Sequence, residues 1–579
     1  MINLKVTFCL LLAACSLLSS CSDYFDPKTD DMLQNSDYIS SSTEMYTGFL
    51  GILTKVQAVG DKEILLTDTR GEMLEPTDNT NSQLIAIYNY EPNLTGNEYA
   101  DPAGYYDVVI ACNDYINKML EYKTNYPDAV EDSVYKDLVS SAIRIKVWTY
   151  KTIAEIYGQA VWFDSSVTKV EQLTEDKYQL LTLQQTIDRC ISLLENGYNG
   201  VAANRIISWY KWLDPDTPLA DSKYRQWDYI VPPMNTLLAE LYLWKGALAD
   251  GADAKAYYQN SADLILTTLN EYINDESYRN TSKPYFMPNA NTRSDYGGYY
   301  WENSARQPYQ RECIAAIIYD YKNNQTNTLL HHFSNEYPNE YQLRPSEYGR
   351  SLFEDNALNP GGSLGDKRAD VTYRQNNAEY YIAKYRKVGS TVRPNAYEDD
   401  VHIYMYRVMH LNLMLAEALN HLDRFVAAEA LLNQGVSNAY DAVEAQEWDG
   451  FTKNWTLQTD WGTAKYSHDG VRGCMGLDSR PFYTSTNQAQ QAGVDIYRYN
   501  DKSIIDEYAT EMSCEGKSYP ALVRMAVCYG DPSIVADRIC PKYPAAKQSL
   551  IRSRIESAGD SNLPGYFVPW KSLTVSPNR

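Results

Sequence analysis

The chain has 579 residues, of which 44% are hydrophobic, and its formal net charge is −23. That length allows about two to four domains, and the apolar fraction is sufficient for a large packed core. The negative charge argues against nucleic acid as a partner, because phosphate backbones are bound by basic surfaces. No stretch after Cys21 approaches the roughly 18 consecutive apolar residues of a membrane-spanning helix, so none is expected in the mature chain.

Residues 1–20 have the pattern of a secretory signal peptide. Lys5 is their single charge, and the apolar run over residues 6–18 is too short to span a bilayer. The run leads into a Leu-Ser-Ser-Cys sequence that ends at Cys21, which resembles a bacterial lipoprotein processing site. We therefore expect Cys21 to be lipidated and to become the mature N-terminus. An ordinary signal peptide followed by a chance Cys is the alternative.

Residues 21–37 are expected to tether the lipid to the folded part of the protein. Aspartates make this segment acidic, among them Asp23, Asp26, Asp30 and Asp31. The segment resembles the export tag of lipoproteins that are sent to the outer face of the outer membrane. A simple solvated tether is the alternative interpretation of the same residues.

Helical patterns follow the tether. Apolar positions recur at helical spacing over residues 105–120, 138–157 and 183–194. The second of these segments carries two apolar stripes, which predicts a helix buried between neighbours. Gly158, directly after it, is typical of a helix C-cap. Thr182, with Gln three residues later, has the spacing of a capping box at the start of the third helix.

Paired helices follow. Apolar stripes over residues 237–248 and 258–269 predict two helices joined near Gly251. Residues 406–436 repeat the arrangement, because apolar periodicity on both sides of a polar break at 421–424 predicts a helical hairpin of tetratricopeptide size. Stacked hairpins bury a continuous core that no single hairpin has. The predicted fold is therefore mostly α: a scaffold of tetratricopeptide-like stacked helical hairpins, with long irregular loop inserts and a few short strands.

Residues 276–400 and 441–500 differ from the scaffold. They are rich in Asn, Gly, Pro, Tyr and Ser and show little helical period. Residues 311–319 are the main exception; this run fits a short strand or a helix, and its β-branched residues favour the strand. Irregular segments on a rigid scaffold often carry binding surfaces, so we expect these inserts to face a ligand or a partner protein.

No motif in the sequence predicts a catalytic, metal or cofactor site. Residues 361–365 match a nucleophile elbow in letters alone, but their flanks lack the strand and helix that an elbow needs. The 6 His form no zinc-binding pattern, and His410 is expected in the core. No phosphate loop or dinucleotide glycine motif is present. We therefore expect that the protein is not an enzyme and that it needs no cofactor and no metal.

Seven of the 10 Cys follow Cys21, and none of them has a Cys-x-x-Cys spacing. An odd number cannot all pair, and a disulfide framework is unusual in a chain of this size. Buried free thiols are expected, with one bridge in the C-terminal third as the alternative.

Aromatic side chains with a polar end are abundant, with 51 Tyr and 11 Trp against 11 Phe. Tyr and Trp combine a flat apolar face with a polar tip, which suits contacts with sugar rings and equally with peptides. Dense patches lie in loop-like sequence at residues 285–309 and 337–341, and a weaker one lies at 88–90. A further cluster around Trp209 is expected to pack in the core or to contact a partner.

The hairpin at residues 406–436 has a distinctive order of residue types. An Arg at 407 is followed by an apolar helix, Ala-Glu-Ala at 416–418, a short turn and Ala-x-x-Leu-Leu-Asn at 428–433. This order resembles the central signature of the SusD/RagB family of outer-membrane nutrient-binding lipoproteins. Further family motifs are resembled over residues 105–113, 142–163, 504–524 and 566–578, so that the resemblance extends over nearly the whole mature chain. Ser518 and Ala521 depart from the family's Arg and Asp, which puts one local salt link in doubt.

The resemblance implies a non-catalytic lipoprotein of the outer membrane that faces the cell exterior. It would bind an oligomeric nutrient, in the first instance a glycan, and deliver it to a SusC-like TonB-dependent transporter, over which it would act as a lid. By analogy with the family's ligand site, the ligand would be bound by Tyr88, Tyr90, Tyr296, Tyr300, Trp301 and Tyr337. The alternatives are a surface glycoside hydrolase, a peptide-binding member of the same family, and a scaffold with no soluble ligand.

This interpretation divides the chain into a signal peptide, residues 1–20; a lipidated tether, 21–37; an N-terminal helical domain, 38–275; and a C-terminal domain, 276–579. Within the C-terminal domain, residues 401–436 are expected to return to the helical scaffold. Residues 276–400 and 441–500 are expected to be the ligand-facing or partner-facing inserts.

Overall fold

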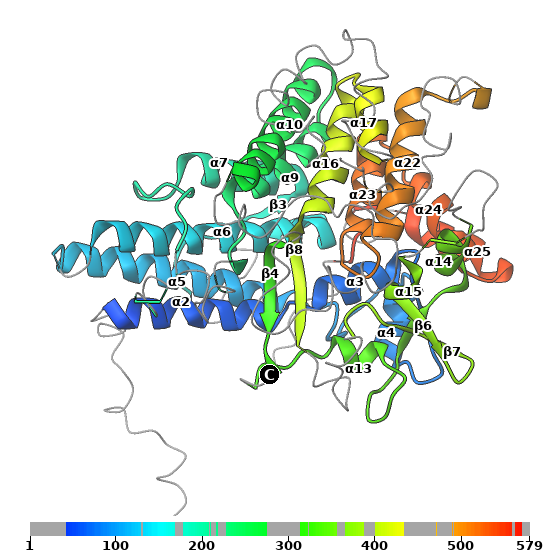
Figure 1. The fold of residues 1–579 in the computed structure, drawn as a ribbon, viewed down its shortest axis with the longest axis horizontal. Helices are drawn as coiled ribbons and strands as arrows, with labels where there is room; N and C mark the ends of the chain where they lie inside the picture. Colours follow the sequence, from blue (N-terminus) through cyan, green and yellow to red (C-terminus); the bar gives the residue numbers. More distant parts are fainter. Residues whose placement is uncertain are drawn as a thin grey trace, which may run out of the picture.

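The protein is seen in a computed structural model (Figure 1). The structure describes residues 42–128, 131–167, 178–207, 230–274, 313–321, 324–355, 365–366, 368–386, 400–432, 491–557 and 562–569, and single residues at 209, 213, 216, 217, 227, 229, 471 and 489. These residues are mostly helical, which confirms the predicted fold class. Among them, no helix combines the length and the apolar character that crossing a bilayer requires.

The first half of the chain forms a series of packed helices. They are α2 (Ser42–Gln57), α3 (Lys62–Arg70), α4 (Ser82–Tyr88), α5 (Ala103–Asn125), α6 (Asp132–Tyr157), α7 (Leu183–Asn196), α9 (Met234–Ala247) and α10 (Gly251–Asn274). α2 packs on α5, α5 on α6, α6 on α7, α7 on α9, and α9 on α10. In Figure 1 the long α5–α6 pair projects to one side of the molecule. Each helix covers an apolar face of its neighbour, as stacked hairpins require.

The second half of the chain continues this series. Its helices are α16 (Val408–His421), α17 (Phe425–Leu432), α22 (Ile496–Glu511), α23 (Ser518–Tyr529), α24 (Ser533–Ile539) and α25 (Ala545–Glu556). α16 packs on both α10 and α22, and α22 to α25 follow one another in contact. The shorter helices are α13 (Leu329–Phe333), α14 (Glu347–Glu354) and α15 (Ala369–Thr372).

Short antiparallel strand pairs join distant parts of the chain. β1 (Leu74–Pro76) pairs with β5 (Leu343–Pro345), β2 (Gln159–Val161) with β3 (Leu180–Thr182), β4 (Cys313–Tyr319) with β8 (Val401–Arg407), and β6 (Tyr373–Asn376) with β7 (Glu379–Ile382). β4 confirms the strand that the β-branched run at 311–319 favoured. All seven residues of β4 and all seven of β8 are buried.

The start of the predicted hairpin at residue 406 needs a correction. Tyr406 and Arg407 are the last residues of β8, where they pair with Ala315 and Cys313 of β4, and the helix begins at Val408. Residues 401–407 therefore belong to a strand and not to the helical scaffold. Local periodicity did not mark this boundary, because partners almost a hundred residues away fix the strand.

Local signals were more reliable at two helix ends. Gly158 has φ 69° and ends α6 in the left-handed conformation, and the side chains of Thr182 and Gln185 form the predicted capping box. Every residue of α6 from Leu138 to Tyr157 is buried, which confirms that this helix lies between neighbours.

Ion pairs are buried where the C-terminal helices meet the rest of the chain. The Arg368 guanidinium binds the carboxylates of Asp366, Glu507 and Glu511, and all four side chains are at most 2% exposed. The Asp68 carboxylate on α3 accepts two backbone N–H groups from the turn after α22. The Asp68 contacts fix α3, which packs on β1 and α4, against the turn after α22.

Candidate functional site

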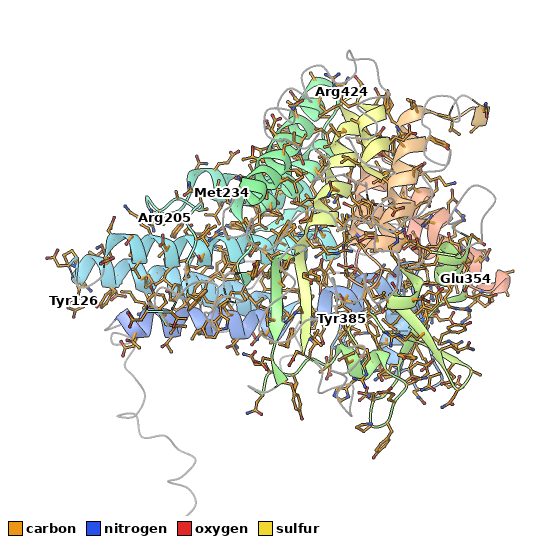
Figure 2. All side chains as sticks on the ribbon, in the orientation of Figure 1. Tyr126, Arg205, Met234, Glu354, Tyr385 and Arg424 are labelled. Atoms are coloured by element: carbon orange, nitrogen blue, oxygen red, sulfur yellow. The ribbon has the colours of Figure 1, made fainter. Side chains whose placement is uncertain are left out.

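An open cleft of about 800 Å³ lies where β1, α4, β5, α14 and residues 541–547 meet. We call it the aromatic cleft, because Tyr88, Tyr348 and Tyr543 line it together with Arg344, Lys542 and Lys547. The cleft is on the side of the molecule opposite to the tip of the α5–α6 pair. Figure 2 places Tyr126 at that tip and Glu354, the last residue of α14, at the other end of the molecule.

Helix α4 forms one wall of the cleft, and the start of this helix is well capped. The Asn81 side chain accepts a hydrogen bond from Leu84 N at 3.0 Å, as a good N-cap residue does. The seven-residue helix then ends at Tyr88, whose ring lies 4.7 Å from the ring of Tyr543. The Tyr543 hydroxyl donates to the Tyr88 carbonyl oxygen, so the two rings form one fixed aromatic surface.

The opposite wall is set by the start of α14. Ser346 caps this helix by accepting from Gly349 N at 2.8 Å, and its hydroxyl also donates to the Glu72 carbonyl at 2.6 Å. This double contact places Tyr348, in the first turn of α14, at the cleft, where its side chain is half-buried.

Arg344 reaches the cleft from β5. The β1–β5 register places Arg344 opposite Glu75, and Arg344 Nε lies 2.8 Å from Glu75 Oε1. Both residues line the cleft, so one charged pair is available to hydroxyl groups of a ligand.

Lys542 is buried against the rings of Tyr88 and Tyr543. Its Nζ donates to the carbonyl oxygens of Thr69 at 2.9 Å and Leu74 at 3.2 Å, and to that of Gly71. Burial lowers the pKa of Lys542 to about 7, while nearby Glu72 and Glu75 oppose that change.

The tyrosine hydroxyls of the cleft stay protonated at neutral pH. Burial raises the pKa of Tyr88, of Tyr348 and of Tyr543. Tyr348, which is half-buried, therefore offers an aromatic face and a neutral hydroxyl beside one charged pair, while Tyr88 (8% exposed) and Tyr543 (2% exposed) are packed into the cleft wall. This combination suits stacking and hydrogen bonding, as sugar rings require. Within the described ranges, no group of three or more His, Cys, Asp or Glu residues is arranged to hold a metal ion.

The residues predicted to bind the ligand have different surroundings. Tyr88 lines the aromatic cleft and is 8% exposed. Tyr90 is 3% exposed, its hydroxyl donates to the Arg70 carbonyl at 2.6 Å, and its ring lies 4.2 Å from the Arg70 guanidinium, so its contacts are those of a packing residue. Tyr337 is 94% exposed on the loop before β5. Tyr296, Tyr300 and Trp301 lie outside the described residues, as does the predicted lipidation site Cys21.

The structure brings the two described aromatic patches, residues 88–90 and 337–341, to the same end of the molecule. Thr80 Oγ1 donates to the Gln342 carbonyl, and Asn81 Nδ2 donates to Gln342 Oε1 at 2.7 Å. These contacts join the loop before α4 to the loop before β5, more than 250 residues later in the chain.

Sequence reasoning missed Tyr348, Tyr543, Arg344 and Lys542. The available signals were weak: a Ser at 346 that caps a helix and is followed by Tyr348, and prolines on both sides of Lys542 and Tyr543. Both patterns predict local turns or helix starts. Neither indicates that the two segments face each other across a cleft.

Other expectations concerned packing. His410 is buried, and burial lowers its pKa, as expected for a core residue. Trp209 is fully buried and its ring packs on the rings of Tyr46 and Phe49, which confirms packing there. The described cysteines at 112, 190, 514, 528 and 540 are free thiols, and Cys474 lies outside the described residues.

Comparison with known proteins identifies the fold. No family model matches the chain, and no curated protein matches it. Among solved structures, a SusD homolog from Bacteroides thetaiotaomicron matches with a TM-score of 0.59 and 12% identity, covering 93% of this chain and 96% of that one. A SusD superfamily protein from Bacteroides vulgatus matches with a TM-score of 0.57 and 12% identity, covering 92% and 96%.

A third solved structure carries a ligand. It is the surface glycan-binding protein A from Bacteroides thetaiotaomicron in complex with laminarihexaose, with a TM-score of 0.51, 13% identity and coverage of 88% and 96%. These matches extend over nearly the whole chain at low identity, and they establish one point. The protein has the SusD-like fold.

Proposed function

We propose that this protein is a non-catalytic, lipid-anchored protein of the outer-membrane surface that binds an oligosaccharide in the aromatic cleft. The observation that carries the proposal is the cleft itself, with three tyrosines and a charged pair on a SusD-like scaffold. A protein of the same fold binds laminarihexaose, which supports a glycan as the ligand class.

The dimensions of the cleft support an oligomeric ligand. Its 800 Å³ lies within the range of about 300–1,000 Å³ that is typical of small-molecule sites. Because the cleft is open, a chain of sugars can pass through it while one ring stacks on Tyr348, the half-buried tyrosine of its wall. Tyr337 and the predicted aromatic residues at 296, 300 and 301 would extend the contact along such a chain.

Delivery to a SusC-like TonB-dependent transporter is the second part of the proposal. Cys21 at the end of the leader-like segment would carry the lipid, and the acidic residues after it would direct the protein to the outer face. The motivation is the lipoprotein-like N-terminus together with the SusD-like fold.

Binding and turnover can be measured together on residues 22–579. We expect calorimetric titration with laminarihexaose and with other oligosaccharides to give saturable binding of at least one glycan, and a peptide library of matched length to give none. Chromatography of the incubated glycan should recover it intact. Hydrolysis by substoichiometric protein would instead establish the glycoside hydrolase, and saturable binding of peptides alone would establish the peptide-binding alternative.

The anchoring and the partner are tested in cells. Replacing Cys21 with Ser should release the protein from the membrane fraction, and deletion of the paired transporter should abolish uptake of the bound glycan. Uptake that continues without the transporter would contradict the proposed delivery.

A further inference from the structure

Lys542 connects two parts of the chain that are far apart in sequence. It is the last residue of the 3-10 turn Cys540–Lys542, and it is buried, with 7% of its surface exposed. Its amine donates to three backbone carbonyl oxygens, those of Thr69, Gly71 and Leu74. All three belong to the short stretch of chain that leads from the end of α3 into β1. An ammonium group has three N–H donors, so these three carbonyls match its full donor set.

The same amine also lies against two walls of the aromatic cleft. Lys542 Nζ is 4.6 Å from the centre of the Tyr88 ring and 5.3 Å from that of the Tyr543 ring. A cation at such distances is attracted to the face of an aromatic ring. Both residues belong to the wall of the cleft and are buried, at 8% and 2% exposure, so the shape of that wall depends on where the amine holds the two rings.

We propose that Lys542 is the positioning residue of the aromatic cleft, and that its protonation state sets how firmly the cleft binds a ligand. This inference rests on the proposed function in one respect, namely that the cleft is the ligand site. The charged amine fixes the turn at residues 69–74 and the two tyrosine rings. A neutral amine has only two N–H donors, so its lone pair would face the third carbonyl, and its attraction to the ring faces would be lost.

The change of protonation falls close to neutral pH. Burial lowers the pKa of Lys542 to about 7, and the surrounding charges act in both directions. Glu72, Glu75 and Asp68 favour the charged amine, whereas Arg70 disfavours it. Glu72 and Glu75 are themselves paired, with Arg538 and Arg344 respectively.

Asp68 needs a control of its own. Burial raises its pKa to about 7, so it titrates over the same range. The other titratable groups against the amine, Tyr88 and Tyr543, have pKa values raised by burial and stay neutral throughout. An Asp68→Asn background therefore isolates Lys542 as the group that changes charge.

The direction of the pH effect follows from linkage. A ligand that prefers the charged amine raises the pKa of Lys542 when it binds, and binding takes up a proton. The affinity is then highest below pH 7 and declines as the pH rises through 7.

One arm of the test needs no ligand. Amide hydrogen exchange of residues 69–76 is compared at pH 6 and pH 8.5, after correction for the intrinsic exchange rate, in the wild type, Lys542→Met and Lys542→Arg. We expect wild-type protection to fall at the higher pH, Lys542→Met to be weakly protected at both, and Lys542→Arg to be protected at both, because Arg stays charged. Lys136→Met, near the tip of α6, is the matched control and should behave as the wild type. Equal wild-type protection at the two pH values would overturn the proposal.

The second arm measures laminarihexaose affinity over the same pH range in the Asp68→Asn background. We expect the affinity to fall by about fivefold from pH 6 to pH 8.5, the size of one cation–ring contact, and Lys542→Arg to remove this dependence. A pH-independent affinity in the presence of Lys542 would overturn the inference while leaving the proposed function intact. Failure of laminarihexaose to bind at any pH would count against the proposed ligand, and the exchange measurement would then decide the role of Lys542.

Discussion

Arg407 and Glu515 form a buried two-point ion pair: Arg407 Nε lies 2.8 Å from Glu515 Oε2, and Arg407 Nη2 lies 2.9 Å from Glu515 Oε1. The pair joins the end of β8 to the turn between α22 and α23. Lys384 Nζ approaches the same carboxylate to 2.6 Å. One carboxylate thus holds together three segments that lie apart in the sequence. Both partners of the pair are at most 2% exposed, so neither charge has access to water as a substitute partner.

Removing that carboxylate should destabilise the fold strongly. We expect Glu515→Gln to lower the free energy of unfolding by about 3–5 kcal/mol, because it removes the buried carboxylate that Lys384 and Arg407 share and leaves Arg407 only its pair with Glu511. Chemical denaturation measures the change. The matched control is Glu556→Gln on α25, whose pair with Arg552 is partly exposed to solvent (35% and 40% of the two side chains), and its effect should stay below about 1 kcal/mol. Equal effects of the two substitutions would show that burial of the pair is unimportant.

The aromatic cleft makes a specific prediction for Tyr348. Tyr348→Ala should weaken laminarihexaose binding by about 1–1.5 kcal/mol, or about five- to tenfold, since it removes one stacking surface from the cleft wall. Calorimetric titration gives the affinity. Tyr126→Ala removes an exposed ring at the opposite end of the molecule and should leave the affinity unchanged (Figure 2). A larger loss at Tyr126 than at Tyr348 would place the ligand elsewhere.

Asp68 should give the stability of the protein a distinct pH dependence. Its carboxylate accepts N–H groups from Cys514 at 3.0 Å and Gly516 at 2.7 Å, yet burial raises its pKa to about 7. Between about pH 4 and pH 7 the folded state therefore binds more protons at this site than the unfolded state, and the free energy of unfolding falls as the pH rises.

Asp68→Asn should remove that contribution, which is on the order of 2–4 kcal/mol between pH 4 and pH 7. The measurement is the difference between wild-type and variant unfolding free energies across this range. A difference that grows in favour of the wild type as the pH rises would contradict the assigned direction.

Two glycines provide an internal comparison of backbone strain. Gly158 has φ 69°, and a Cβ there would lie 2.8 Å from the Phe567 ring, so Gly158→Ala should cost at least about 1–2 kcal/mol and lower the melting temperature. Gly51 lies within α2 with nothing within 4 Å of a Cβ, and Gly51→Ala should stabilise the protein by about 0.5–1 kcal/mol. The same sign for both substitutions would be incompatible with these backbone assignments.

The helical scaffold was predictable because its signals are local. The two apolar stripes before Gly158, the capping box at Thr182 and the hairpin after Val408 all arise within a few turns of chain, and the structure places helices at each. The strand at 401–407 was not predictable in this way. Its pairing with β4 depends on residues nearly ninety positions earlier, and its last two residues also fit the period of the helix that follows.

The candidate site was predictable only in part. Tyr88 was predicted by analogy with the ligand site of the resembled family, and it lines the aromatic cleft. Tyr90, two residues later, is turned into the core by a positive φ of 53° and bonds to Arg70, which no local pattern indicated. The signals at Tyr348 and Tyr543 were weak and local, and they did not indicate a shared cleft, because each residue lies in a short segment whose role depends on the other.

The sequence by itself determined the class of the scaffold, the ends of its main helices and the supply of tyrosines for a binding surface, since each depends on residues close together in the chain. Tertiary structure alone decided which tyrosines share a cleft, that Lys542 lies against two of them, and that Arg407 meets Glu515. The physical reason is that these relations join segments separated by about a hundred residues or more, and only packing of the completed core fixes which distant side chains become neighbours.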